Sequence, residues 1–261
     1  LGGAQALRVS GVMTWTGGAM TGTGQTVVNG SLLIGGATLK DITQRTLVNA
    51  GTATWAEGVN GRIRTGSGVV IQNTGVWQDQ NTVATQISND FGGPASSFVN
   101  SGSYVKSGGA ASTGIQIGFT NTGTVDVQGG RLDVALQGGA TSNGAFTGTA
   151  NATLGFISGS GSGTHTLSAA GSVSGLNVAF NGGVVDFAGS YSGVTSTTIT
   201  SGTANFVQAG VVTTGSVTVN GGALTANAGG GMDASALTLS GGTLGGAQAL
   251  RVSGVMTWTG G

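Results

Sequence analysis

The sequence predicts an all-β fold, a right-handed parallel β-helix (β-solenoid) of roughly 11–12 coils with about 20–27 residues in each coil. Three observations predict it: a recurring Asn-x-Gly pattern, a recurring Gly-Gly pattern, and the exact repetition of residues 1–18 as residues 244–261. The composition agrees, because Val, Thr and Ile occur in short alternating runs broken by Gly or Asn-Gly, which is typical of strands and turns.

Four segments align without gaps and carry an Asn followed two residues later by Gly. The asparagines are separated by 24, 27 and 21 residues and are Asn49, Asn73, Asn100 and Asn121. Flanking positions of the same parity are apolar, which places them on one side of a strand: Leu47, Ile71, Phe98 and Phe119 before, and Ala53, Trp77, Tyr104 and Val125 after. Each segment therefore predicts one coil whose apolar stripe is buried by stacking, with the asparagines forming an amide ladder.

Glycine pairs mark a second set of turns. They occur at Gly35-Gly36, Gly129-Gly130, Gly182-Gly183, Gly221-Gly222 and Gly241-Gly242, and the last two pairs are 20 residues apart. We expect glycine to form the corners of the coils because tight bends often require a positive φ. Parallel crossover connections favour the right-handed sense of winding.

The exact 18-residue repeat predicts a tandem array with a period of 243 residues. We interpret residues 1–243 as one complete repeat unit and residues 244–261 as the start of the next identical unit. The beginning at Leu1 fits an excerpt from a longer polypeptide. Arrays of this kind are typical of fibres, stalks and spacers, which favours a structural role over catalysis.

The composition narrows the possible classes of protein. The chain has 55 Gly, one Pro and no Cys, and only 6% of its residues are charged, with eight basic and eight acidic side chains. A single proline and no Gly-X-Y period exclude collagen, and 38% hydrophobic residues argue against disorder. The neutral balance predicts no nucleic-acid partner, and no apolar run is long enough for a membrane helix.

Two stretches interrupt the pattern. Residues 81–97, which include Pro94, are expected to bulge out as a loop. Residues 56–67 form the most charged stretch and predict either a solvated turn or a specific binding surface.

The strings TWTGG, VNAGTATW, FVNSGSYVKSGG, GFTNTGTVDVQGGRLDV and LTLSGGTL together resemble the long repeats of very large bacterial surface and secreted proteins, of the filamentous-haemagglutinin and autotransporter-passenger type. The resemblance covers nearly the whole chain. It implies a bacterial, exported, right-handed β-helix with a role in adhesion or structural extension, and an extracellular or cell-surface location. The absence of cysteine agrees with export. No family active site comes with the resemblance.

Candidate reactive residues lack the partners that catalysis requires. His165 is the only histidine, so a zinc site is disfavoured and a surface position on a strand is expected. The GSGSG string at residues 159–163 matches the letters of a nucleophile elbow, but a glycine-serine turn is the better interpretation.

Asp126 and Asp133 flank a glycine corner and Arg131, and by alternation they point outward. They predict either solvated charges, a weakly supported Ca²⁺ site, or a groove of the kind found in polysaccharide lyases. The GGGMD string at residues 229–233 is one poor match to a calcium-binding repeat. We therefore predict no catalytic, cofactor-binding or metal-binding residues.

The large aromatic residues have two possible roles, which are core packing and stacking on sugar rings. Trp77 and Tyr104 fall in an apolar column and predict core positions, whereas Trp55 aligns with Asp79 and Lys106 and is expected to be exposed. Trp15 recurs as Trp258. Threonine pairs have irregular spacing, so no single ice-binding column is expected; they are Thr14/Thr16, Thr52/Thr54, Thr164/Thr166 and Thr198/Thr200.

The leading hypothesis is a non-catalytic, structural or adhesive, rod-like module of a giant extracellular fibre, whose units stack end to end. Lateral self-association into filaments is a further option, because the wall of the solenoid carries little charge. The alternative is a multivalent carbohydrate-binding surface, in which repetition provides avidity. A polysaccharide-processing enzyme is less favoured.

Overall fold

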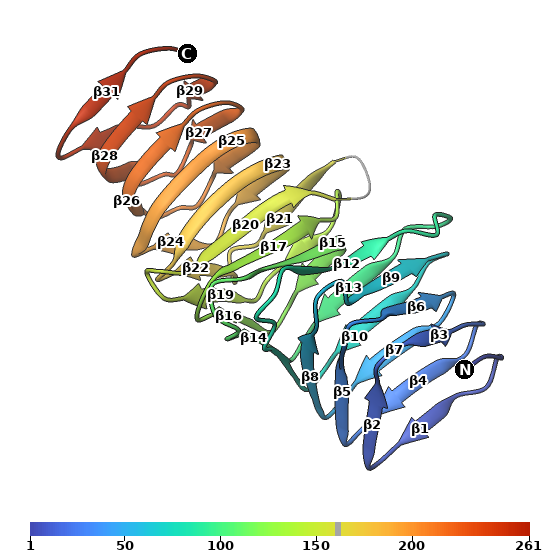
Figure 1. Cartoon of the computed structure of the whole chain (residues 1–261). Helices are drawn as coiled ribbons and strands as arrows, with labels where there is room; N and C mark the ends of the chain where they lie inside the picture. The colour runs from blue at the N-terminus through green and yellow to red at the C-terminus, as the bar shows by residue number, and fades with distance from the viewer. Residues whose placement is uncertain (160–162) are drawn as a thin grey trace.

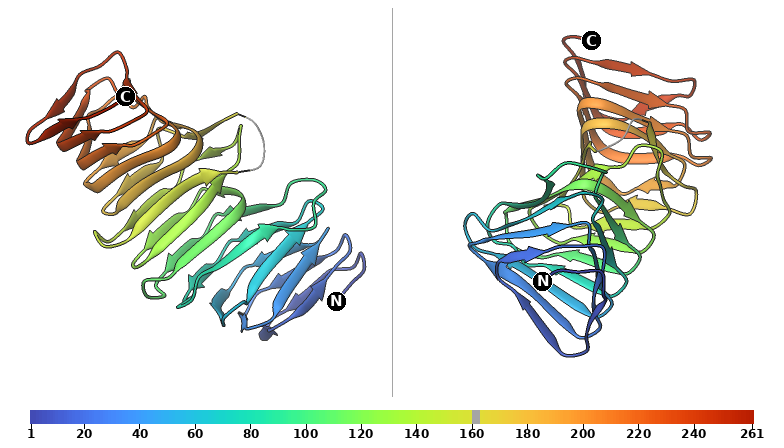
Figure 2. Two further views of the ribbon diagram at one scale, coloured as in Figure 1. Left: turned by 45° about the horizontal axis from the view of Figure 1, so that its top comes forward. Right: turned by 90° about the vertical axis from the view of Figure 1, so that its right-hand side faces the viewer.

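A computed structural model of the chain describes residues 1–159 and 163–261. Within these residues there is no helix, and short strands stack as parallel coils into an elongated β-solenoid (Figure 1). The two termini lie at opposite ends of the stack, as Figure 2 shows. The structure has about 12 coils of roughly 21 residues, which confirms the predicted parallel β-solenoid.

The strands form two sheets along the axis. The nine strands of the smaller sheet are β2 (Val12–Trp15), β5 (Ser31–Gly36), β8 (Thr52–Glu57), β11 (Val76–Asp79), β14 (Ser103–Lys106), β16 (Thr124–Val127), β19 (Ala145–Gly148), β22 (Ser172–Ser174) and β24 (Ser190–Ser192). The first strands of the larger sheet are β1 (Leu7–Val9), β3 (Gly18–Met20), β4 (Gln25–Val28), β6 (Leu39–Thr43), β7 (Thr46–Asn49), β9 (Arg62–Gly66), β10 (Val70–Asn73), β12 (Thr85–Asn89), β13 (Ser97–Asn100), β15 (Ser112–Asn121) and β17 (Arg131–Leu136). Its remaining strands are β18 (Thr141–Ser142), β20 (Thr153–Ser158), β21 (Thr164–Leu167), β23 (Asn177–Phe187), β25 (Val194–Phe206), β26 (Val212–Val219), β27 (Ala223–Ala226), β28 (Met232–Leu239), β29 (Thr243–Gly245), β30 (Leu250–Val252) and β31 (Met256–Trp258).

The register of the stacked strands follows the alignment of the four Asn-x-Gly segments. Phe98 of β13 pairs with Ile71 of β10 on one side and with Phe119 of β15 on the other. Later coils are shorter, since Thr203, Ala223 and Thr243 pair in succession at intervals of 20 residues. The pattern read from the sequence therefore gives the correct neighbours in this part of the solenoid.

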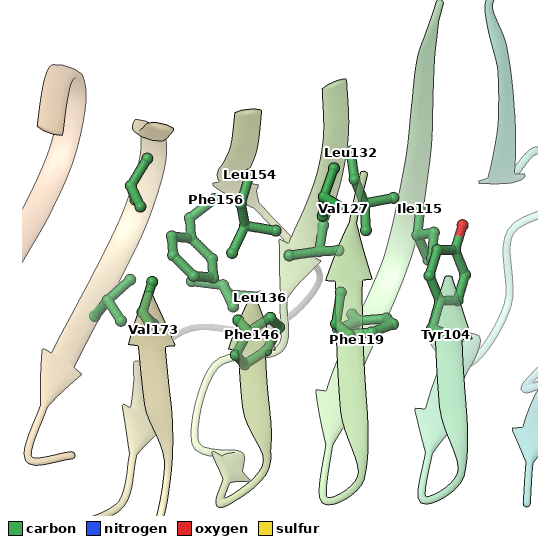
Figure 3. Packing of buried hydrophobic residues seen from close by; sticks show 14 of the residues in the cluster. Tyr104, Ile115, Phe119, Val127, Leu132, Leu136, Phe146, Leu154, Phe156 and Val173 are labelled. Carbon is green, nitrogen blue, oxygen red and sulfur yellow. The ribbon is translucent and has the colours of Figure 1, made fainter. Parts of the chain in front are cut away.

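The core is a continuous column of buried side chains inside the stack. Aromatic rings contact one another from Trp55 to Phe206, with neighbouring ring centroids between 4.9 and 6.5 Å apart. Figure 3 shows part of this column, where Tyr104, Phe119, Phe146 and Phe156 project inward among Leu and Val side chains. One coil cannot bury its apolar stripe alone, so stacked coils place similar apolar side chains on top of one another.

The predicted asparagine ladder is present and fully buried. The amide nitrogen of Asn49 donates to the side-chain oxygen of Asn73 at 2.8 Å, and the same bond links Asn73 to Asn100 at 2.7 Å and Asn100 to Asn121 at 2.8 Å. Each amide nitrogen also donates to a backbone carbonyl of the following coil, as Asn73 does to Ser103 at 2.9 Å. The ladder satisfies polar groups at a corner that water does not reach.

Glycine acts differently in the two families of turns. In every Gly-Gly pair the second glycine has a positive φ, between 65° and 90°, which confirms the expectation for that family. The expectation is wrong for the Asn-x-Gly glycines, none of which has a positive φ. At Gly75 a Cβ would overlap the carbonyl oxygen of Gly51 in the coil below, so close approach of two backbones requires glycine there. The same overlap recurs at Gly51, Gly102 and Gly123.

The two interruptions are more regular than expected. Residues 81–97 contain strand β12, which pairs with β9 and β15 and buries Ile87, so the irregular backbone is limited to residues 81–84 and 90–96. The prediction of one long bulge is wrong, because Pro94 lies after the pairing segment rather than within it.

Residues 56–67 are not simply a solvated turn either. Glu57 ends β8 and is buried, while Arg64 in β9 pairs with Asp41 at 2.8 Å on the outer face. The charges of this stretch are therefore largely neutralised within the solenoid.

Candidate functional site

The two carboxylates near Arg131 do not form a common site. Arg131 contacts both oxygens of Asp133 through Nε, at 2.8 and 2.9 Å. Asp126 lies on β16 in the other sheet and accepts a hydrogen bond from Gln128 at 2.8 Å. Both carboxylates are half-buried and point outward, as expected, but only Asp133 contacts Arg131. No group of three or more potential metal-ligating side chains gathers in residues 1–159 and 163–261.

His165 lies inside the solenoid, so the expected surface position is wrong. Its Nε2 is 3.0 Å from the hydroxyl of Ser142, and its Nδ1 is 3.2 Å from the carbonyl of Gln137. Burial lowers the pKa of His165, and the bond to the Gln137 carbonyl opposes this shift only in part. The residue is a satisfied core histidine. In the GSGSG string, residues 160–162 lie outside the described part of the chain.

The aromatic residues are almost all core residues. Trp77 and Tyr104 are fully buried as predicted, but so is Trp55, whose expected exposure is wrong. The reason is strand parity: Trp55 is two residues beyond Ala53, which points inward, so it points inward as well. The exposed aromatic side chains in the described residues are Phe91 and Trp258, and Arg64 covers the ring of Phe91 at 5.0 Å.

One outward threonine column exists that the sequence spacing did not predict. Thr198, Thr218, Thr238 and Thr257 pair in succession along β25, β26, β28 and β31. At the other end of the chain the corresponding column is broken, because Leu33 lies between Thr14 and Thr54. A long flat threonine face is therefore not formed.

The outer face of the larger sheet carries a shallow groove of about 590 Å³. Its polar side chains include Arg62, Gln86, Gln116 and Asp133. Gln86, Gly114 and Asp133 pair in succession across the floor. Gly114 keeps the floor low between the longer side chains of Gln86 and Asp133.

The two copies of the 18-residue repeat form matching strands at opposite ends of the solenoid. Strands β1 and β30 begin and end at equivalent residues, and Met13–Trp15 of β2 corresponds to β31. Gly3 and its equivalent Gly246 both have a positive φ, as do Gly18 and Gly261. We call this segment the shared coil.

The two copies of the shared coil have neighbours on opposite sides. The C-terminal copy contacts the preceding coil, and the N-terminal copy contacts the following coil. At the C-terminal end, Arg251 pairs with Asp233 of the preceding coil at 3.0 Å, and Met256 pairs with Leu237. At the N-terminal end, Met13 pairs with Leu32 of the following coil. Trp15 is 5% exposed under that coil, whereas Trp258 is 67% exposed because no coil follows it here.

Arg45 holds the shared coil from the following side. Its guanidinium is buried and donates to the carbonyls of Gly3 at 3.1 Å, Gln5 at 3.3 Å and Gln25 at 2.8 Å, and to the hydroxyl of Thr26 at 2.8 Å. One side chain thus ties three successive coils together. The sequence offers little signal for this role, since an arginine before a strand usually lies at the surface.

Buried charges between β6 and β14 were also missed by sequence reasoning. Lys40 pairs with Glu57 at 2.5 Å, and Lys106 lies 3.9 Å from Asp79, all four side chains being fully shielded from solvent. Strand parity was the available signal, since Asp79 and Lys106 follow the inward residues Trp77 and Tyr104 by two.

Comparisons with known proteins give no further assignment: no family model, no curated protein and no solved structure matches the chain. The described residues contain no helix that is long and apolar enough to span a membrane.

Proposed function

We propose that the chain is a non-catalytic structural module whose units stack end to end into a rod, as part of an extracellular fibre at a bacterial cell surface. The observation that carries the proposal is the shared coil, which forms matching strands at both ends but is covered on opposite sides. The repeat resemblance and the absence of cysteine support the location.

The shared coil provides the geometry for the joint. Placing residues 244–261 of one unit at residues 1–18 of the next puts the coil between two neighbours. Arg251 would then contact Asp233 of the preceding unit, and Arg45 of the following unit would reach the carbonyls of Gly246 and Gln248. Stacking would also cover Trp258 to the extent that Trp15 is covered.

Such a joint extends the solenoid without a break. Stability then grows as a sum of coil and neighbour terms, and no open strand edge remains between units. Each unit would add about 55 Å of axis at about 4.8 Å per coil. The number of units would set the length of the rod.

Proteins with one, two and three tandem units test the proposal. Electron microscopy should show straight rods that lengthen by about 55 Å for each added unit. Separate globules joined by flexible gaps would contradict it. As a matched pair, Trp258→Asp at an internal joint should create a hinge, whereas the same substitution in the terminal coil should leave the rod straight.

The second candidate is carbohydrate binding in the groove lined by Gln86 and Gln116. Amide and carboxylate groups on a low floor are suited to hydrogen-bond sugar hydroxyls. Trp55 cannot act as the sugar platform because it is buried. On a glycan array, Gln86→Ala together with Gln116→Ala should abolish retention, with Asn220→Ala as a control on an exposed residue elsewhere. If the native three-unit protein bound no glycan on the array, carbohydrate binding would be ruled out as the function of this groove.

A further inference from the structure

A buried cluster of polar side chains lies on the inner faces of β8, β11 and β14. In the stacked register, Asp79 has Trp55 in the coil below and Lys106 in the coil above. All three side chains are fully buried in the core. Burial of an amine beside a carboxyl group in an apolar interior is costly unless both are satisfied.

The two buried lysines differ in how they are satisfied. Lys40 donates to the Thr38 carbonyl at 2.8 Å and to Glu57 at 2.5 Å, as expected for an ammonium ion. Lys106 Nζ has no hydrogen-bond partner within the described structure, and the nearest carboxylate oxygen, Oδ2 of Asp79, is 3.9 Å away. Burial lowers the pKa of Lys106, and the Asp79 charge offsets this only in part. Lys106 therefore loses its proton more readily than an exposed lysine does, and the neutral amine is a nucleophile.

The carboxyl group of Asp79 is held by donors on both oxygens. Oδ1 accepts hydrogen bonds from the backbone nitrogen of Asn81 at 3.1 Å and from its side-chain nitrogen at 2.7 Å. Oδ2 accepts a hydrogen bond from the hydroxyl of Tyr104 at 3.0 Å. Two N–H donors on one oxygen resemble the arrangement that stabilises the oxyanion of an acyl-transfer step.

We propose that Lys106 and Asp79 become joined by an intramolecular amide bond that cross-links β11 to β14. The Nζ lone pair attacks Cγ of Asp79, and the negative charge that develops on Oδ1 is stabilised by the two N–H groups of Asn81. The C–O bond to Oδ2 then breaks, and this oxygen leaves as water with two protons that both come from the Lys106 nitrogen. One passes to Oδ2 before the attack, which frees the Nζ lone pair, and the other leaves the nitrogen as the amide forms. Tyr104 relays one of these protons through its hydroxyl and ends unchanged. No oxidant or reductant is needed.

The link would have a mechanical consequence for the solenoid. Its ends are paired residues of adjacent coils, so the covalent bond runs along the axis, parallel to the direction in which a rod is pulled. It would also remove the unsatisfied amine from the core. This inference does not depend on whether the units stack end to end.

The mass of the intact, denatured protein tests the proposal. The linked chain should be lighter than the sequence mass by one water molecule. Trypsin should fail to cleave after Lys106 and should release one peptide covering 65–131, whereas an unlinked chain gives peptides 65–106 and 107–131. Lys40 is the internal control, because its paired ammonium should leave cleavage after residue 40 intact. An intact mass equal to the sequence mass, together with a free 65–106 peptide, would overturn the proposal.

Two variants separate the chemistry from folding. Lys106→Arg keeps a cationic side chain but should show the full sequence mass. Tyr104→Phe keeps the ring in the core and should lower the linked fraction severalfold, because the proton relay is lost. A Tyr104→Phe protein as fully linked as the native chain would overturn the part assigned to the hydroxyl. A Lys106→Arg protein that still lost water would overturn the assignment to Lys106.

Discussion

Trp15 and Trp258 occupy the same position in two copies of one coil, yet Trp15 is 5% exposed and Trp258 is 67% exposed. The difference arises because Ile34 of β5 pairs with Trp15, while no strand follows Trp258. Since the two copies have the same sequence and matching strands, the neighbouring coils, rather than the segment itself, determine how far the tryptophan is buried. Trp258 therefore lacks the contact that Trp15 makes with Ile34 in the following coil.

Addition of a second unit is expected to bury Trp258. The other three tryptophans are buried, so acrylamide quenching of one unit should report mainly Trp258. In a two-unit protein the quenchable fraction should fall, and each joint should contribute about 2 kcal/mol from burial of this side chain. An unchanged quenchable fraction per tryptophan would contradict the joint.

Substitution of Asn73 by Ala should destabilise the protein by about 1–3 kcal/mol, because it orphans buried amide groups on Asn49 and Asn100. Denaturant titration measures the change. Asn220→Ala is the matched control, since the Asn220 side chain bonds to Ser240 at the surface. Equal effects of the two substitutions would argue against the ladder.

Replacement of Gly75 by Ala should be severely destabilising, since the added Cβ overlaps the carbonyl of Gly51 in the coil below. Gly210 has open space around its Cβ position and no positive φ, so Gly210→Ala should be neutral or slightly stabilising. Thermal unfolding of both variants checks the contrast. A mild effect at Gly75 would show that the coils can separate locally.

Trp55→Ala should cost about 3–5 kcal/mol through the cavity that it creates in the aromatic column. It should also leave Glu57 without the indole donor that lies 2.9 Å from its Oε1. Trp258→Ala in the same one-unit protein is the control and should change stability little. Unfolding in urea distinguishes these outcomes, and similar losses for both would contradict the inward position of Trp55.

Acidification should weaken the coil that contains His165. The folded state holds the pKa of His165 below 6.5, so the unfolded chain binds a proton first as the pH falls. This contribution is fully present above pH 6.5 and is lost as the pH falls from there towards the folded-state pKa. Urea midpoints at several pH values between neutral and mildly acidic conditions should decrease accordingly. His165→Gln should lose this slope, and a native protein without any slope would contradict the shift.

Local patterns were sufficient for the fold and for much of its register. The spacing of Asn49, Asn73, Asn100 and Asn121 predicted which strands are neighbours, because identical side chains stack well in a parallel column. The outward direction of Asp126 and Asp133 followed from alternation alone. Strand β12 was missed because Gly92, Gly93 and Pro94, which follow it closely, are typical of a loop.

The candidate sites were predicted less well, because the type of each residue was given more weight than its position in the strand. Trp55 was assigned to the surface because it aligns with Asp79 and Lys106, and His165 because it is a lone polar residue without metal-binding partners. Both side chains point inward in their strands. Arg45 gave no local signal, because its acceptors come from coils up to 42 residues away. Contacts at such separations arise only when the coils are stacked.

The sequence by itself determined the parallel coil architecture, the asparagine ladder and the existence of an identical segment at both ends, since each is encoded in residues that recur at regular spacing. Only the tertiary structure decided which charges are buried, that Lys106 lies beside Asp79 without a hydrogen bond, and that Trp258 is left uncovered. The physical reason is that pairing and periodicity act within and between neighbouring strands. Burial and the satisfaction of charges depend on every side chain that meets inside the stack.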